Sequence, residues 1–339
     1  MSNGHHTFSL GDLVLRSGAV LPEARLGYRT WGELNERADN VILLPSYYTG
    51  TSGSHASMIG KGLAFDPSHY FVVAIDLFGN GHSTSPSNFG RHASDFPMVS
   101  VADNVDAQRQ LLSSLGIARI KLIYGWSLAA IQAHHWAVMY PDAVDAYVAV
   151  CGASGCWPQN RVFLEAQRAI LAVDPLFIEA RADAPPTRGL RAFGRAYAGW
   201  GFSPRFFRDE LYRQSGFETL EQFLEFWEED HLTWNAWDLH ATLMTWLTAD
   251  ITTLIGQPGS LDAALGRVKA KAVLIPCTED RYFTNEENMI EAGHISRSRH
   301  LPLVSPYGHA AGGPGRYEAE MKFITGAVHQ VLHETTDEH

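Results

Sequence analysis

The sequence predicts an α/β protein in which a mostly parallel, eight-stranded sheet carries an inserted helical cap. Three observations support this class: short apolar runs that end in turn residues, helical patterns between those runs, and one long segment where the alternation stops. Near-continuously apolar strands are typical of a parallel sheet that helices cover on both faces. The 339 residues suffice for one large domain with an insertion, or for two ordinary domains.

The predicted strands and helices alternate along the chain. The five buried strands are expected at 40–45, 70–76, 120–124, 146–151 and 270–277. The clearest helices between them are expected at 101–115 and 128–140. This alternation implies right-handed crossovers between parallel strands. The first two segments differ, because 8–15 and 24–31 are expected to form an antiparallel edge pair joined near Gly18.

The alternation stops between residues 157 and 258, where no convincing buried strand is found. This segment holds six of the nine tryptophans and has helical patterns at 218–229 and 239–254. We expect 157–258 to form a helical cap on a core made of 1–156 and 259–339. The cap aromatics could line a substrate pocket, although a single Trp more often fills a hydrophobic core.

Composition argues against several classes of partner. The net charge is −11 without any Lys/Arg block, which disfavours nucleic acid and anionic membrane surfaces. No stretch approaches the roughly 18 apolar residues of a membrane span, and the polar first eight residues lack the apolar core of a secretory signal. The three cysteines have no Cys-x-x-Cys spacing, so no disulfide framework is expected and a cytoplasmic location is predicted.

The strongest functional signal is Gly125-Trp126-Ser127-Leu128-Ala129, which follows a buried strand and leads directly into a helix. This is the context of a nucleophile elbow, in which a strained turn exposes a serine hydroxyl at the carboxyl end of the sheet. The usual pattern is Gly-x-Ser-x-Gly, and here Ala129 replaces the second Gly. The alternative is that Ser127 is an ordinary helix N-cap.

A serine nucleophile needs a base, and the base needs a carboxylate that orients it, in the chain order Ser, acid, His. The acid is expected after a late strand, where Glu279 and Asp280 compete. Asp280 is favoured because it begins the loop that should descend toward the base. The segment 301–309 is expected to hold the next strand. His309 stands at its end, in a loop of small residues. Ser127, Asp280 and His309 are therefore the predicted catalytic triad.

Other motifs are assigned supporting roles or none. Backbone N–H groups of Leu128 and of the loop 46–50 are expected to form the oxyanion hole. The motif at 76–83 contains Gly-x-Gly but lacks a third Gly and a following helix, so it is interpreted as a structural turn. His231 and His240 are nine residues apart and no His-Glu-x-x-His occurs, so neither a metal nor a cofactor is predicted.

With these residues identified, the chain resembles the homoserine O-acetyltransferase family of α/β-hydrolases. The matching strings lie at 26–35, 48–52, 96–105, 140–142 and 280–283, together with the elbow. The resemblance implies the α/β-hydrolase fold with a helical cap, and often a homodimer. It also implies Ser127, Asp280 and His309 as catalytic residues, with Tyr48 and Leu128 as the oxyanion donors.

The chain departs from that family at positions that contact the substrate. Ala310 follows His309 where the acetyltransferases usually have Asp, a residue expected to help hold a charged amino acid. Tyr47 and Trp126 make the mouth of the pocket bulkier and more apolar, and Trp157 is also expected to line it. These departures favour the hydrolase-like branch of the family.

The favoured function is serine-dependent hydrolysis of a carboxylic ester through an acyl-enzyme on Ser127. An O-acyltransferase would use the same residues and pass the acyl group to an alcohol. A lactone or C–C bond hydrolase on the same triad is a further alternative. A non-enzymatic binding protein is disfavoured because it would not need all three residues. The expected partner is a small-molecule acyl substrate.

Overall fold

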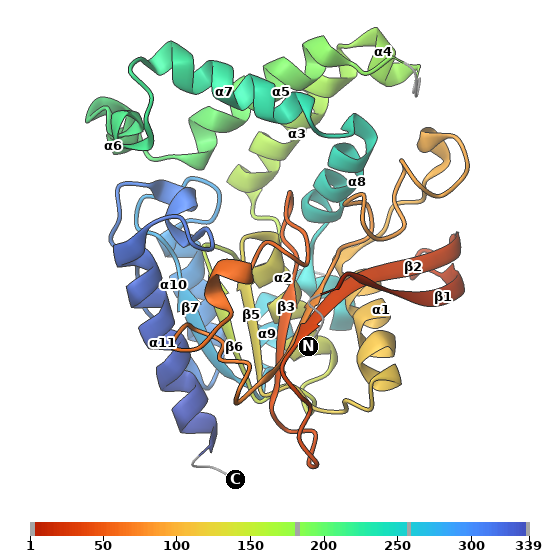
Figure 1. The fold of residues 1–339 in the computed structure, drawn as a ribbon, viewed down its shortest axis with the longest axis vertical. Coiled ribbons are helices and arrows are strands. Elements are labelled where there is room, and N and C mark those ends of the chain that lie inside the picture. Colours follow the sequence, from red (N-terminus) through yellow and green to blue (C-terminus); the bar gives the residue numbers. More distant parts are fainter. Residues whose placement is uncertain (1–3, 180–183, 256–258, 337–339) are drawn as a thin grey trace.

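The computed structural model describes residues 4–179, 184–255 and 259–336, whose strands form one eight-stranded sheet (Figure 1). The strand order is β1-β2-β4-β3-β5-β6-β7-β8. The pairs β1–β2 and β2–β4 are antiparallel and the other pairs are parallel, which confirms the predicted sheet. The strands are β1 His6–Val14, β2 Val20–Trp31, β3 Val41–Pro45, β4 Phe71–Ile75, β5 Leu122–Trp126, β6 Ala146–Val150, β7 Lys271–Ile275 and β8 Ser298–His300.

Two hydrophobic cores lie on opposite faces of the sheet. Successive side chains of a strand point to opposite faces, so Val41 and Leu43 of β3 belong to one core and Ile42 and Leu44 to the other. Helices α1, α2 and α10 contribute to the first core and α11 to the second. Both faces are therefore covered, as the apolar strands predict. These helices are α1 Val101–Ser114, α2 Leu128–Met139, α10 Asn285–His294 and α11 Glu318–Thr336.

A layer of helices lies between β6 and β7 in the chain and covers the end of the sheet at which Ser127 lies (Figure 1). Its described residues contain no strand. The helices are α3 Pro158–Ala172, α4 Pro175–Ile178, α5 Thr187–Gly201, α6 Pro204–Arg208, α7 Leu220–Leu232 and α8 Ala236–Leu247, and a short α9 Leu261–Leu265 precedes β7. We call α3 to α8 the cap. Its predicted end, residue 258, lies outside the described residues.

Two predicted elements differ from the structure. The helix expected at 239–254 ends at Leu247, because the Asp250 side chain accepts the Thr252 N–H and starts a separate 3-10 turn, Ile251–Ile255. The strand expected within 301–309 lies earlier, at Ser298–His300. Pro302 and Pro306 have no backbone N–H, and beyond the Leu301 N–H, which donates to the Leu274 carbonyl, the segment continues the pairing as an isolated bridge from Leu303 to Cys277. Within the described residues, no helix combines the length and apolar character needed to cross a membrane.

Candidate active site

Ser127 occupies a strained turn between β5 and α2. Its φ of 61° lies in the left-handed region, which is uncommon for a residue with a side chain. The turn depends on glycine: a methyl group on Gly125 would collide with the Ala129 carbonyl, and one on Gly152 would lie 2.8 Å from the Ser127 carbonyl oxygen. The Ser127 side chain makes no helix-capping hydrogen bond. The N-cap alternative therefore fails, and the hydroxyl is available to another partner.

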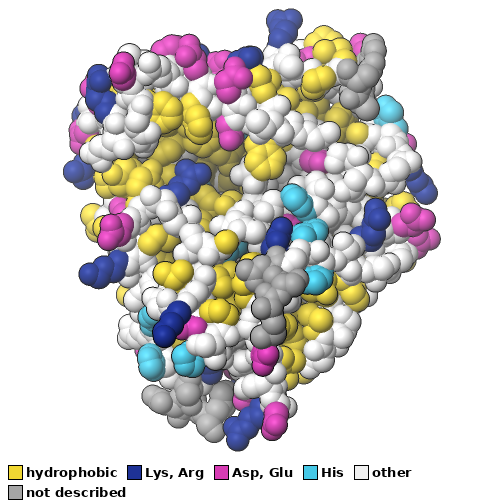
Figure 2. Space-filling view, in the orientation of Figure 1, with side chains coloured by type: hydrophobic (Ala, Val, Ile, Leu, Met, Phe, Trp, Pro, Cys, Tyr) yellow, Lys and Arg dark blue, Asp and Glu magenta, His cyan; other side chains and the backbone are white. Residues whose placement is uncertain are grey.

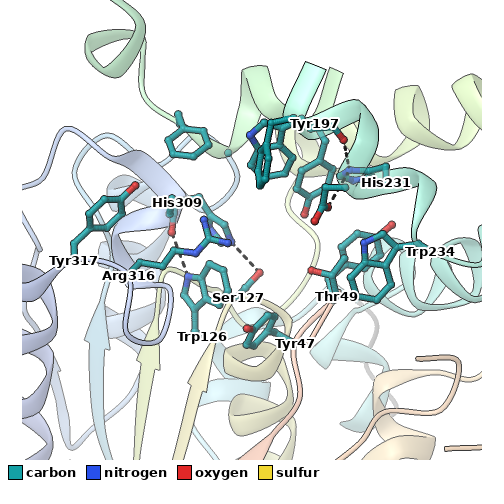
Figure 3. Close-up of a pocket in the computed structure, with 17 residues that line it drawn as sticks. Tyr47, Thr49, Trp126, Ser127, Tyr197, His231, Trp234, His309, Arg316 and Tyr317 are labelled. Atoms are coloured by element: carbon teal, nitrogen blue, oxygen red, sulfur yellow. Dashed lines mark hydrogen bonds and ion pairs between the residues drawn. The ribbon is translucent and has the colours of Figure 1, made fainter. Parts of the chain in front are cut away.

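The three residues predicted to act together form a continuous chain of hydrogen bonds. His309 Nε2 lies 3.0 Å from Ser127 Oγ (Figure 3), and His309 Nδ1 lies 2.8 Å from Asp280 Oδ2. Because a carboxylate only accepts, Nδ1 carries the proton toward Asp280 and Nε2 is left to accept the Ser127 hydroxyl proton. The competing carboxylate, Glu279, instead lies 4.0 Å from Arg205.

Asp280 is held by the backbone that follows it. Its Oδ1 accepts the N–H groups of Tyr282 at 2.8 Å and Phe283 at 3.3 Å. Both aromatic rings also pack against His309, with centroid distances of 4.7 and 5.7 Å. The string that follows Asp280 in the sequence therefore orients the carboxylate and encloses the imidazole at the same time.

Trp126 supports His309 from the core side. Its indole stacks on the imidazole at a centroid distance of 5.1 Å, and its Nε1 donates to the His309 carbonyl at 3.2 Å. The small residues after His309 are needed for this contact, because a methyl group on Gly312 would lie 2.7 Å from Trp126 Cδ1. Trp126 thus holds His309 in place in addition to lining the pocket.

The two predicted oxyanion donors are free to bind a ligand. Within the described parts of the chain, the backbone N–H groups of Tyr48 and Leu128 donate to no other group. Leu128 is the first residue of α2, where helix N–H groups have no intrahelical acceptor. The Tyr48 side chain anchors its loop to the cap, since its hydroxyl donates to the Leu239 carbonyl at 3.2 Å.

Ser127 and His309 lie at the base of a cavity of about 500 Å³ between the core and the cap. Figure 2 shows hydrophobic side chains gathered in the hollow below the cap. The remaining lining residues are Tyr47, Tyr48, Thr49, Trp126, Ala310, Arg316 and Tyr317 from the core side and Tyr197, Gly201, Phe202, Phe226, Trp227, Asp230, His231 and Trp234 from the cap (Figure 3). The cap therefore completes the cavity whose floor is formed by the core.

The residues that line the cavity agree only in part with those predicted from the sequence. Tyr47 and Trp126 line the cavity as expected, but Trp157 does not. Trp157 is turned away at the start of α3, where its indole N–H donates to the buried Glu291 carboxylate at 2.8 Å. The charged residues Asp230 and Arg316 are not among the predicted site residues, because no motif marks them; Arg316 lies only seven residues after His309.

One group of described residues has the donor atoms for a metal ion: those of His5, Asp76 and His82 lie within 4.8 Å of one another. Hydrogen bonds already engage the Asp76 carboxylate, which accepts from the Ser52 N–H at 2.7 Å and contacts His5 Nε2 at 3.0 Å. Ser83 Oγ donates to the Asp76 carbonyl at 2.8 Å. These contacts close the turn at 76–83, in agreement with its structural interpretation.

Comparisons with known proteins identify the family of this chain. A family model described as alpha/beta hydrolase fold matches residues 39–309. An ethyl acetate hydrolase of Pseudomonas veronii is 33% identical over 308 residues, covering 89% of this chain and 88% of that protein. A homoserine O-acetyltransferase of Chlorobaculum tepidum is 33% identical over 322 residues, covering 88% and 87%. The crystal structure of an acetylester hydrolase from Corynebacterium glutamicum superposes with a TM-score of 0.93 at 31% identity, over 97% and 96% of the two chains.

The fold and these relatives define an enzyme of the serine hydrolase type. The chain belongs to the alpha/beta hydrolase fold family, within a group that contains both esterases and homoserine O-acetyltransferases.

Proposed function

We propose that this protein hydrolyses a carboxylic ester through an acyl-enzyme on Ser127. The observation that carries the proposal is the hydrogen-bond chain from Asp280 through His309 to Ser127 at the base of a cavity. The relatives named as an ethyl acetate hydrolase and an acetylester hydrolase support a short acyl group.

In the proposed reaction, Ser127 Oγ attacks the ester carbonyl carbon while His309 Nε2 takes the hydroxyl proton. Asp280 stabilises the imidazolium, and the N–H groups of Leu128 and Tyr48 donate to the oxyanion. The C–O bond to the alcohol then breaks, and His309 returns its proton to the leaving alkoxide. A water molecule then attacks the carbonyl carbon of the acyl-enzyme while His309 Nε2 takes its proton. The C–O bond to Ser127 breaks, His309 returns the proton to Ser127 Oγ, and the acid is released.

Transfer of the acyl group to an alcohol acceptor is the second candidate, supported by the homoserine O-acetyltransferase relative. Both reactions use the same acyl-enzyme and differ in whether water or an acceptor resolves it. Hydrolysis is favoured by Ala310, which is buried against the cavity beside His309. The Ala310 methyl group cannot hold the amino group of an acceptor, as a carboxylate at this position would.

The test is the hydrolysis of ethyl acetate and p-nitrophenyl acetate in ¹⁸O-labelled water, with products followed by mass spectrometry in the presence and absence of homoserine and other alcohols. Hydrolysis predicts acetate with one labelled oxygen and no change when acceptors are added. An acetylated acceptor that accumulates at the expense of acetate would instead assign the transferase reaction. The homodimer and the cytoplasmic location stay predictions from the sequence.

A further inference from the structure

We propose that Arg316 selects esters that carry a carboxylate group away from the reacting ester bond. The inference rests on the proposed ester hydrolysis and adds the class of substrate. It follows from the position of Arg316 in the cavity, from the lack of a partner for its charge, and from the composition of the surrounding walls.

Arg316 is placed in the cavity by the glycine-rich loop that also carries His309. A methyl group on Gly313 would lie 2.7 Å from Arg316 Cδ and 3.0 Å from its Nε, so the arginine stem lies directly over the Gly313 backbone. Arg316 lines the same cavity as Ser127, and its side chain extends from beside Tyr317 toward the centre of the site (Figure 3). A guanidinium in this position can contact a substrate that is bound to Ser127.

The charge of Arg316 also affects the pKa values of tyrosines on both walls of the cavity. Burial raises the pKa of Tyr47, while the hydrogen bond to Ser54 and the Arg316 charge oppose that rise. The pKa of Tyr197, on the cap, is raised by burial and is likewise lowered in part by Arg316. Arg316 is exposed and lines the cavity between the core and the cap, so its guanidinium is accessible to a bound substrate.

Among the described residues, no side chain forms a hydrogen bond or an ion pair with the Arg316 guanidinium. By contrast, Arg195 on the cap is paired with both Glu221 and Glu228. The chain has 37 Asp and Glu against 26 Lys and Arg, so the absence of a carboxylate beside Arg316 does not come from a shortage of acidic residues. A guanidinium binds carboxylates through two parallel hydrogen bonds, and exclusion of water by a substrate strengthens the attraction.

Asp230 sets the orientation of such a substrate. It lies on α7 and lines the same cavity, with its carboxylate 3.4 Å from His231 Nδ1. No ion pair joins Asp230 to Arg316 in the described structure, so the cavity has a positive group on its core side and a negative group on its cap side. A carboxylate is therefore attracted to the Arg316 side and repelled from the cap side.

The size and the walls of the cavity define the rest of the substrate. A volume of about 500 Å³ is much larger than an acetyl group requires, and aromatic rings of Tyr197, Trp227 and Trp234 form much of the cap wall. Such walls favour an apolar body. We therefore assign the substrate to the class of esters with an apolar body and a terminal carboxylate, in either the acyl or the alcohol part.

The test compares kcat/KM for pairs of esters of matched size. Monoethyl adipate and ethyl hexanoate place a carboxylate or a methyl group in the acyl part, and 4-acetoxybutanoate and butyl acetate do so in the alcohol part. Arg316→Ala should lower kcat/KM for a carboxylate-bearing ester about 10- to 100-fold, as expected for a charge-assisted pair, and for the neutral esters less than about 2-fold. Arg316→Lys should retain part of the preference, and Arg316→Glu should lower it further.

Arg208→Ala is the matched control, since Arg208 is a cap arginine that does not line the cavity. An equal loss on neutral and anionic esters, or no loss on either anionic ester, would overturn the inference. A loss confined to one anionic ester would support it and would identify the part of the substrate that carries the carboxylate. If the wild-type enzyme hydrolysed none of the four esters, the proposed function itself would fail, which is distinguishable from failure of the Arg316 proposal.

Discussion

The two walls of the cavity differ in how their polar atoms are satisfied. On the core side, His309 uses both ring nitrogens, toward Asp280 and Ser127. On the cap side, the indole N–H groups of Trp227 and Trp234 are buried without a hydrogen-bond partner among the described residues. The hydrogen bonds of His309 are thus already formed before substrate binds, whereas these two cap donors are available to a ligand.

This difference assigns distinct roles to the two walls. Preorganised hydrogen bonds lower the barrier of a reaction because they need no rearrangement as charge develops. A buried donor without a partner costs about 1–3 kcal/mol, and a substrate that supplies an acceptor regains part of that free energy. We therefore expect variants of Ser127, Asp280 and His309 to change the rate on every ester, and cap variants to change the preference among esters.

The largest effect is expected for Ser127→Ala. Removal of the nucleophile should lower kcat by roughly 10⁶-fold on all esters, with the melting temperature little changed because the Ser127 side chain makes no helix-capping hydrogen bond. Adding His309→Ala to this variant should cost little more, because the members of a triad act as a unit. Rate measurements with the single and double variants test this, and wild-type rates in Ser127→Ala would refute the assignment of the nucleophile.

The next largest effect is expected for Asp280→Asn. An amide in this place favours the wrong tautomer of His309, and the loss in kcat should be about 10³-fold. Glu279→Gln is the matched control, because the adjacent Glu279 carboxylate faces Arg205 and not His309. Equal kinetic losses in the two variants would mean that the acid of the triad has been assigned wrongly.

A smaller and selective effect is expected for Trp234→Ala on the cap wall. Loss of this lining ring should lower kcat/KM about 5- to 30-fold for esters with a long or aromatic apolar part, since about 1–2 kcal/mol of apolar contact is removed. The change for ethyl acetate should stay below about 2-fold. Trp237→Ala, which removes a ring that stacks on Phe177 outside the cavity, is the control and should not alter the preference. A uniform loss on short and long esters would contradict the division between the walls.

An effect on stability, with no change in activity at the site itself, is expected at the junction between the core and the cap. Glu291 is fully buried on α10, where it accepts the Ser154 hydroxyl at 2.7 Å, and burial raises its pKa from 4.5 to about 7. The proton is thus bound more tightly in the folded state. The stability linked to this proton is fully present below about pH 4.5 and is lost as pH rises through about 7.

Glu291→Gln removes this titration and keeps an acceptor oxygen for Ser154 and Trp157. The free energy of unfolding of the wild type, relative to the variant, should fall by ~3 kcal/mol between pH 4.5 and pH 8. Urea unfolding at several pH values measures this difference, with the exposed Glu286→Gln as the control. A difference between wild type and Glu291→Gln that does not vary with pH would refute the role of Glu291.

Some features of the molecule follow from local sequence alone. The elbow could be predicted because Gly125 and Ser127 satisfy a steric requirement within a few residues of the chain, and the structure has the strained φ of 61° at Ser127. The order Ser127, Asp280, His309 could be predicted because each residue follows a strand, and the carboxyl ends of parallel strands meet at one edge of the sheet. The position of β8 does not follow from the local pattern, because the apolar residues Leu301 and Leu303 lie just after the strand Ser298–His300.

The composition of the substrate cavity was decided by the tertiary structure. Trp157 is aromatic and lies at the predicted start of the cap, but a carboxylate 134 residues away in the chain holds its indole N–H outside the cavity. Arg316 and Asp230 line one cavity although they belong to different layers, and neither has a neighbouring pattern that marks it. Thus the sequence determined the chemistry, because the elbow is a local steric device on a predictable sheet. The docking of the cap determined which residues line the cavity, because the lining depends on long-range packing that no short pattern encodes.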